Sequence, residues 1–102
     1  MKKIFNVSFK KTEGLTLNNL GEKVELRHEE CDGGKVKIKY LFDEIRLYCE
    51  KCESERKAPL GEKGAQAFIL ALEHGTPHTI EFFKDWPFGH TEINFTPREG
   101  ND

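Results

Sequence analysis

Four residues of the sequence have the types and spacing of a metal site. His28 and Cys31 are separated by two residues, as are Cys49 and Cys52, and 17 residues lie between the two pairs. Two intervening residues allow a tight turn to aim both side chains at one ion. Zinc prefers four nitrogen and sulfur ligands in a tetrahedron. The spacing therefore predicts one structural Zn²⁺ bound by His28, Cys31, Cys49 and Cys52.

The segments around these residues have the pattern of strands. Val24, Leu26 and His28 alternate with charged residues, which predicts a strand that leads into the first ligand turn. Alternation over 36–40 and 45–49 predicts two antiparallel strands joined around Asp43 and Glu44. Such a hairpin returns the second ligand pair to the first. Two glycines follow Cys31, and a residue that tolerates positive φ lets backbone N–H groups curl toward a thiolate.

With these turns and strands, the segment 24–57 resembles the zinc ribbon family of small three-stranded modules. The commonest ribbon pattern has cysteine where this chain has His28, and three cysteines with one histidine is a variant of it. The resemblance implies a fold element and a metal ion. It implies no particular activity, because zinc ribbons occur in proteins of many functions.

Three other interpretations of the same residues stay open. The three cysteines could form a site without His28, and Cys49 with Cys52 could be a metal-free redox pair, although the βαβ context of such pairs is missing. His28-Glu29-Glu30 with the Cys49 pair also matches the ligand order of zinc deaminases. With Cys31 as a fourth ligand, however, no position is left for a catalytic water. We therefore expect a protein that is not an enzyme.

The rest of the chain is expected to complete a single α+β domain over residues 1–102. Lys3 to Phe9 alternates like a strand, and 78–83 and 91–95 suggest two more short strands. Ala65, Phe68, Ile69 and Leu72 form a helical stripe, which predicts an amphipathic helix over 61–75 that ends at Gly75. Residues 97–102 are expected to be a tail. The predicted architecture is an antiparallel zinc-ribbon sheet with one C-terminal helix and flanking strands.

Composition favours a metal-stabilised cytoplasmic domain. Charged residues make up 33% of the chain and apolar residues 36%, so the core is thin and a metal crosslink would add folding energy. No apolar run approaches the roughly 20 residues that span a bilayer, and the N-terminus does not have the pattern of a signal peptide. We expect a cytoplasmic location and no membrane partner. The sequence carries no signal for the oligomeric state.

The C-terminal quarter contains a cluster of aromatic residues. Phe82 and Phe83 are adjacent, so in a strand they face opposite sides, and one ring should be exposed. Such rings could complete the core over the helix, or they could anchor another protein. The predicted function is a small adaptor or regulator that binds a protein, with the contact assigned to Phe83, Trp86 and Phe88.

Nucleic-acid binding is the alternative function, through basic residues and an aromatic residue on the ribbon strands. The candidate residues are Lys35, Lys37, Lys39, Arg46 and Tyr48. The net charge of −2 and the interspersed glutamates argue against simple binding to a polyanion. Lysines on an exposed strand also protect sheet edges from association.

Overall fold

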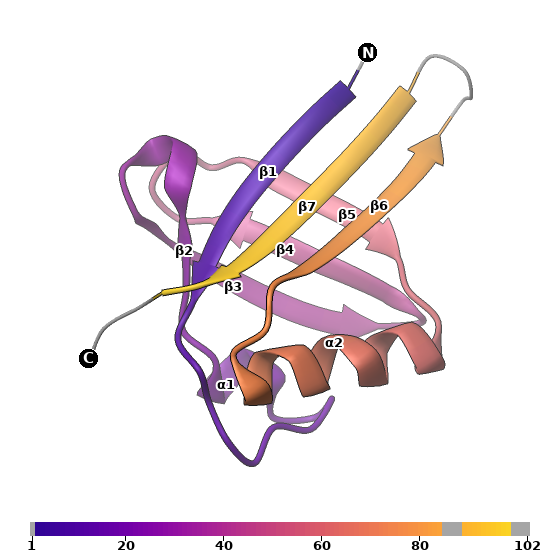
Figure 1. The fold of residues 1–102 in the computed structure, drawn as a ribbon. Helices are drawn as coiled ribbons and strands as arrows, with labels where there is room; N and C mark the ends of the chain where they lie inside the picture. Colours follow the sequence, from indigo (N-terminus) through magenta and orange to yellow (C-terminus); the bar gives the residue numbers. More distant parts are fainter. Residues whose placement is uncertain (1, 85–88, 99–102) are drawn as a thin grey trace.

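The computed structural model describes residues 2–84 and 89–98, and in these ranges seven strands form a single sheet. The strand order is β5-β4-β3-β2-β1-β7-β6, and the edge strands β5 and β6 approach each other. The sheet therefore curls into a nearly closed barrel (Figure 1). Its strands are β1 (Lys2–Phe9), β2 (Leu26–His28), β3 (Gly34–Leu41), β4 (Glu44–Cys49), β5 (Glu55–Pro59), β6 (His78–Lys84) and β7 (Gly89–Pro97).

One long helix, α2 (Glu62–His74), lies across one end of this barrel (Figure 1). It buries the predicted stripe of Ala65, Phe68, Ile69 and Leu72, so the sequence-based prediction of this helix is confirmed. Gly75 ends it at φ 72°, a left-handed conformation that favours glycine, and its N–H donates to the carbonyl of Ala71. Two short segments, α1 (Leu20–Lys23) and the 3₁₀ turn η1 (Glu29–Cys31), lie between the first strands.

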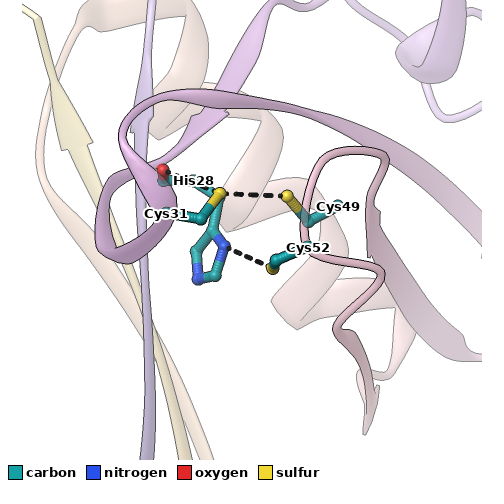
Figure 2. Close-up of side chains that lie close together, drawn as sticks. All are labelled: His28, Cys31, Cys49 and Cys52. Carbon is teal, nitrogen blue, oxygen red and sulfur yellow. Dashed lines mark hydrogen bonds between the residues drawn. The ribbon is translucent and has the colours of Figure 1, made fainter.

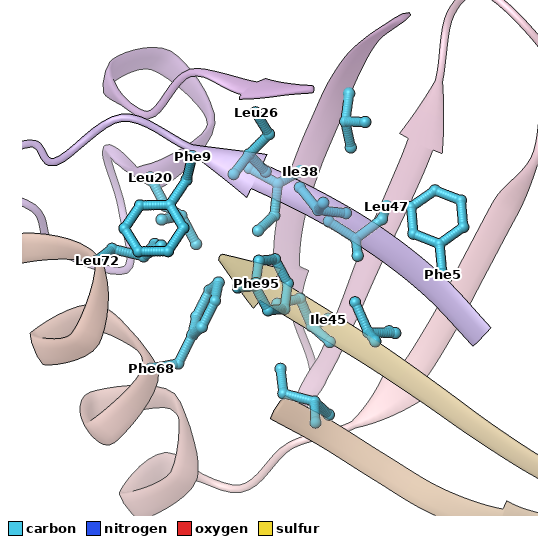
Figure 3. Packing of buried hydrophobic residues seen from close by; sticks show 14 of the residues in the cluster. Phe5, Phe9, Leu20, Leu26, Ile38, Ile45, Leu47, Phe68, Leu72 and Phe95 are labelled. Atoms are coloured by element: carbon cyan, nitrogen blue, oxygen red, sulfur yellow. The ribbon is translucent and has the colours of Figure 1, made fainter. Parts of the chain in front are cut away.

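The apolar core fills the space between α2 and the inner face of the sheet (Figure 3). Phe68 from the helix packs against Phe95 from β7, with ring centroids 4.6 Å apart. The period-two pattern of β1 places Phe5, Val7 and Phe9 on the inner face, where all three are fully buried. These residues line the barrel along its length.

The predicted α+β class and its antiparallel zinc-ribbon sheet are wrong. Strands account for 48% of the chain and the one long helix for 13 residues, so the domain is mainly β. The ribbon segment is not a separate sheet either, because β2 pairs with β1 over Val7 to Phe9. Residues 24–57 thus supply three of the seven strands in the described part of the barrel and the first part of a fourth, β5.

Pairing between the two chain ends explains why the prediction failed. β1 and β7 are parallel, in register from Lys2 opposite His90 to Phe9 opposite Pro97. A period-two pattern identifies a strand and its buried face, but only hairpin partners are indicated by a local turn. β5 carries no clear strand pattern, because its sequence is charged and only Ala58 is buried in it. The local sequence therefore could not indicate barrel closure.

The end of the described chain is part of the folded domain. Pro97 closes β7, and the N–H of Arg98 donates to the carbonyl of Phe9 at 2.8 Å. The Arg98 guanidinium also pairs with Glu25 at 3.0 Å. Two residues of the expected tail are thus held against the barrel, and 99–102 lie outside the described residues. No helix among the described residues is long and apolar enough to cross a membrane.

Candidate metal centre

The first ligand turn lies at the end of β2. Leu26 and His28 share the inner face of this strand, and His28 is only 5% exposed. The 3₁₀ turn η1 then carries the chain round to Cys31. Asp32 and Gly33 adopt positive φ values of 68° and 80°, and the Gly33 N–H donates to the carbonyl of His28 at 2.9 Å. These two residues reverse the chain into β3.

The second ligand turn lies at the end of β4. Cys49 is fully buried, and its N–H donates to the carbonyl of Ser54 at 2.9 Å. Its carbonyl accepts from the N–H of Glu53, which has φ 60°. The turn thus carries Cys52 back toward Cys49. Because β3 and β4 form a hairpin through Phe42 and Asp43, the second turn lies beside the first.

All four predicted ligands converge on one point between the two turns (Figure 2). The sulfur atoms of Cys31 and Cys49 are 3.3 Å apart, and the Cys52 sulfur is 3.4 Å from Nδ1 of His28. The four ligand atoms all lie within 4.8 Å of one another. Sulfur ligands at the usual Zn–S distance of about 2.3 Å would be about 3.8 Å apart in a regular tetrahedron. The group is therefore close enough to hold a metal ion.

His28 is oriented by Glu30 and by Phe5. Its Nε2 lies 2.9 Å from the Glu30 carboxylate, and its ring stacks on Phe5 with centroids 4.1 Å apart. Burial raises the pKa of Glu30, but hydrogen bonds from the backbone and side chain of Asn6 outweigh it and lower this pKa overall. An ionised Glu30 accepts a hydrogen bond from Nε2, which leaves the lone pair of Nδ1 facing Cys52.

The thiols differ in their surroundings. Hydrogen bonds from the Ser54 side chain and backbone lower the pKa of Cys52 to about 6. Desolvation raises the pKa of the Cys31 thiol, and the neighbouring Cys49 raises it further. A bound cation would deprotonate all three, because a coordinating thiol loses its proton. Cys52 is thus more readily available as a thiolate than Cys31 before a metal arrives.

Gly34 allows the two turns to approach each other closely. A Cβ atom at this position would lie 2.8 Å from the sulfur atoms of both Cys31 and Cys49, and 2.6 Å from Cβ of Lys51. The sequence indicated that the glycines after Cys31 serve backbone conformation. Gly33 does so with its positive φ, whereas Gly34 is required for space.

The residues predicted to bind partners fall into two groups. Phe83 is 53% exposed and stacks on His90, while Phe82 packs against the core, as expected for neighbours on a strand. Trp86 and Phe88 lie outside the described residues. The five nucleic-acid candidates all line one groove of about 430 Å³ on the outer face of β3 and β4, namely Lys35, Lys37, Lys39, Arg46 and Tyr48.

Sequence patterns missed the residues around the ligands and one further group. Glu30 follows His28 by two positions, which is the only local signal for its role, and Asn6 and Phe5 come from a distant strand. Glu81, His90 and Glu92 also bring three ligand atoms within 4.8 Å on β6 and β7. His90 forms an ion pair with Glu81 at 2.8 Å there.

Comparisons with protein-family models, curated proteins and solved structures give no match for this chain.

Proposed function

We propose that His28, Cys31, Cys49 and Cys52 hold one structural Zn²⁺ in a domain that acts by binding, without catalysis. The convergence of these four ligand atoms within 4.8 Å carries the proposal. Three thiolates and one imidazole match the donor set of structural zinc sites. Soft sulfur ligands also disfavour magnesium and calcium, which prefer oxygen.

A full set of protein ligands argues against catalysis at the metal. Catalytic zinc sites keep one position for water or substrate, and four converging side chains leave none. In a deaminase-like site a glutamate would serve as the proton shuttle beside that water. Glu30 instead contacts His28 and Asn6, a position that suits an orienting role. These contacts favour a zinc-ribbon-type structural centre over a hydrolase.

A domain with a structural metal acts through its surface. Binding of a protein through Phe83, Trp86 and Phe88 remains a prediction, since Phe83 alone lies in the described part of the chain. The nucleic-acid alternative has a specific observation in its favour, because its five candidate residues share one groove. An adaptor or regulatory role is compatible with either partner.

Metal content of purified protein tests the zinc centre. We expect about one zinc ion per chain in wild type purified without added metal, measured by plasma mass spectrometry. His28→Ala and Cys31→Ser should each lose at least half of it, because either change opens the coordination shell. His74→Ala is the matched control, since His74 is exposed at the end of α2.

Two results would contradict the proposal. Wild-type protein without stoichiometric zinc would remove the centre altogether. Full zinc content in His28→Ala would exclude His28 as a ligand and leave a site of three sulfur atoms.

A further inference from the structure

The groove beside the metal centre concentrates positive charge on a protein that is negative overall. Four cations and two acidic residues line it, which leaves a formal charge of +2 against −2 for the whole chain. The cations are the outward-facing residues of β3, with Arg46 from β4. The two acidic residues are Glu25 and Glu55.

Strand register places like charges directly opposite one another on this face. Lys39 lies opposite Arg46, which in turn lies opposite Lys57 on β5. Arg27 on β2 lies opposite Lys35. Like charges that face each other across strands are destabilising, so these rows cost the free protein stability. An anion bound between them would relieve that cost.

Edge protection does not explain Lys35. This residue lies where β3 has β2 on one side and β4 on the other, and it faces Arg27 on β2. β2 pairs with β3 only over Gly34 to Val36, so Lys37 and Lys39 lie on a part of β3 without a β2 partner. Lysines that prevent association belong on edge strands, so the position of Lys35 calls for another explanation.

Acidic neighbours neutralise only some of the cations. Glu44 pairs with Arg46 at 2.8 Å, and Glu50 pairs with Lys37 at 3.2 Å. Lys35 and Lys39 have no ion-pair partner within 4.0 Å among the described residues. These two ammonium groups are the ones most available to an external anion.

An aromatic ring stands among the cations. Tyr48 is 38% exposed, and the register places it between Lys37 and Glu55, one row from the pair of Lys39 and Arg46. An exposed ring bordered by cations can stack on a nucleobase while the cations contact its phosphates. A base is accessible to such stacking only when it is not paired within a duplex.

We propose that this groove binds a single-stranded nucleic acid, with phosphates at Lys35, Lys39 and Arg46 and one base stacked on Tyr48. The proposal names the partner of the binding domain inferred above, and it therefore rests on that function. The metal centre borders the groove directly, because Tyr48 precedes Cys49 and Lys35 follows Gly34. Zinc would thus fix the ends of the two strands that carry the contacts.

Fluorescence anisotropy with labelled 12-nucleotide single strands, oligo-dT and oligo-U, tests the proposal at about 50 mM salt. Wild type should bind at least one of them, and the difference between the two distinguishes DNA from RNA. The double variant Lys35→Ala/Lys39→Ala removes two phosphate contacts. The negative slope of log affinity against log salt should therefore become less steep by about 1.4. Lys11→Ala/Lys63→Ala is the matched control, with the same charge change at exposed sites elsewhere.

Variants of Tyr48 test the stacking contact separately. Tyr48→Ala should weaken binding about 5- to 150-fold, whereas Tyr48→Phe should retain it, because stacking needs the ring and not the hydroxyl. A 12-base-pair duplex should bind more weakly than the single strands. Zinc content is measured for each variant, so that loss of the metal centre is distinguished from loss of the groove.

Three outcomes would overturn the proposal. The first is that zinc-loaded wild type binds neither single strand. The second is that the groove double variant and the control double variant bind equally well. The third is that the duplex binds as tightly as the single strands and Tyr48→Ala has no effect. In each case a zinc content of one per chain would leave the metal centre intact. The partner would then have to be sought among proteins.

Discussion

The two ends of the barrel are lined by different kinds of side chain. Figure 1 shows α2 along one end and η1 at the other. At the helix end, large apolar side chains from the helix and the sheet fill the space, and they are at most 1% exposed: Phe9, Leu20, Phe68, Leu72 and Phe95. At the other end the space between two turns holds three sulfur atoms, the His28 ring and Phe5 stacked against it.

The comparison shows how a chain with few apolar residues can complete a fold. Apolar packing is non-directional, and the stability lost when a buried side chain is shortened grows with the volume removed. Metal coordination is directional and depends on every ligand, so its loss is abrupt. β2 has only three residues, which leaves the metal end little sheet on which to build an apolar core. The proposed zinc ion would hold that end through four side chains.

The largest effect is expected from Cys49→Ser. Cys49 is fully buried and supplies one of the four proposed ligands, so the variant should lose the metal. Structural zinc contributes about 10 to 16 kcal/mol in zinc-finger peptides, which is comparable to the whole stability of a domain. We expect no cooperative thermal transition near that of wild type by circular dichroism. A variant that melts within about 2 °C of wild type would show that the metal end needs no metal.

Phe68→Ala should lower the free energy of unfolding through lost apolar packing and not through lost metal. Removing a fully packed phenylalanine typically costs about 3 to 5 kcal/mol, measured here by urea unfolding of zinc-loaded protein. Because Phe68 packs at the helix end against Phe95, the folded variant should still contain one zinc per chain. Loss of zinc from the folded variant would mean that the two ends are not independent.

Gly34→Ala should perturb the metal end without removing a ligand. The added methyl group would lie 2.8 Å from two sulfur atoms, and overpacking of this kind costs about 1 to 3 kcal/mol. Gly61→Ala is the matched control, because nothing lies within 4 Å of a Cβ there and its φ is −69°. Urea unfolding should separate the two variants. Equal stability would contradict the close approach of the two turns.

Glu30→Ala should weaken metal affinity and leave the fold intact. Loss of a carboxylate that orients a histidine ligand typically costs 10- to 100-fold in affinity. Competition with a chromophoric chelator measures this change. Glu29→Ala is the control, because Glu29 is the exposed neighbour in the same turn. Equal affinity of the two variants would show that Nε2 of His28 needs no acceptor.

The convergence of the four proposed ligands could be predicted because the signal for it is local. The spacing of His28 with Cys31 and of Cys49 with Cys52 reflects two tight turns, and a hairpin joins them within 25 residues. Their supporting residues depend on tertiary structure. Asn6 and Phe5 reach the site only because β1 pairs with β2, and nothing in either local segment specifies that pairing.

The same distinction applies to the fold. The helical period of 62–74 identified α2 and its buried face, because a 3.6-residue repeat is a property of the segment alone. The parallel pairing of β1 with β7 joins residues about 88 positions apart, and only the packed core selects it. The charged strand β5 becomes a strand because β4 pairs with it, not because of its own sequence.

X-ray absorption spectroscopy at the zinc edge tests the central claim most directly. On protein purified without added metal, we expect three sulfur ligands at about 2.3 Å and one nitrogen ligand at about 2.0 to 2.1 Å. In the zinc that the His28→Ala variant retains, the nitrogen contribution should be absent and the sulfur shell should remain. Absence of stoichiometric zinc, or a shell of oxygen ligands in the wild type, would contradict the account.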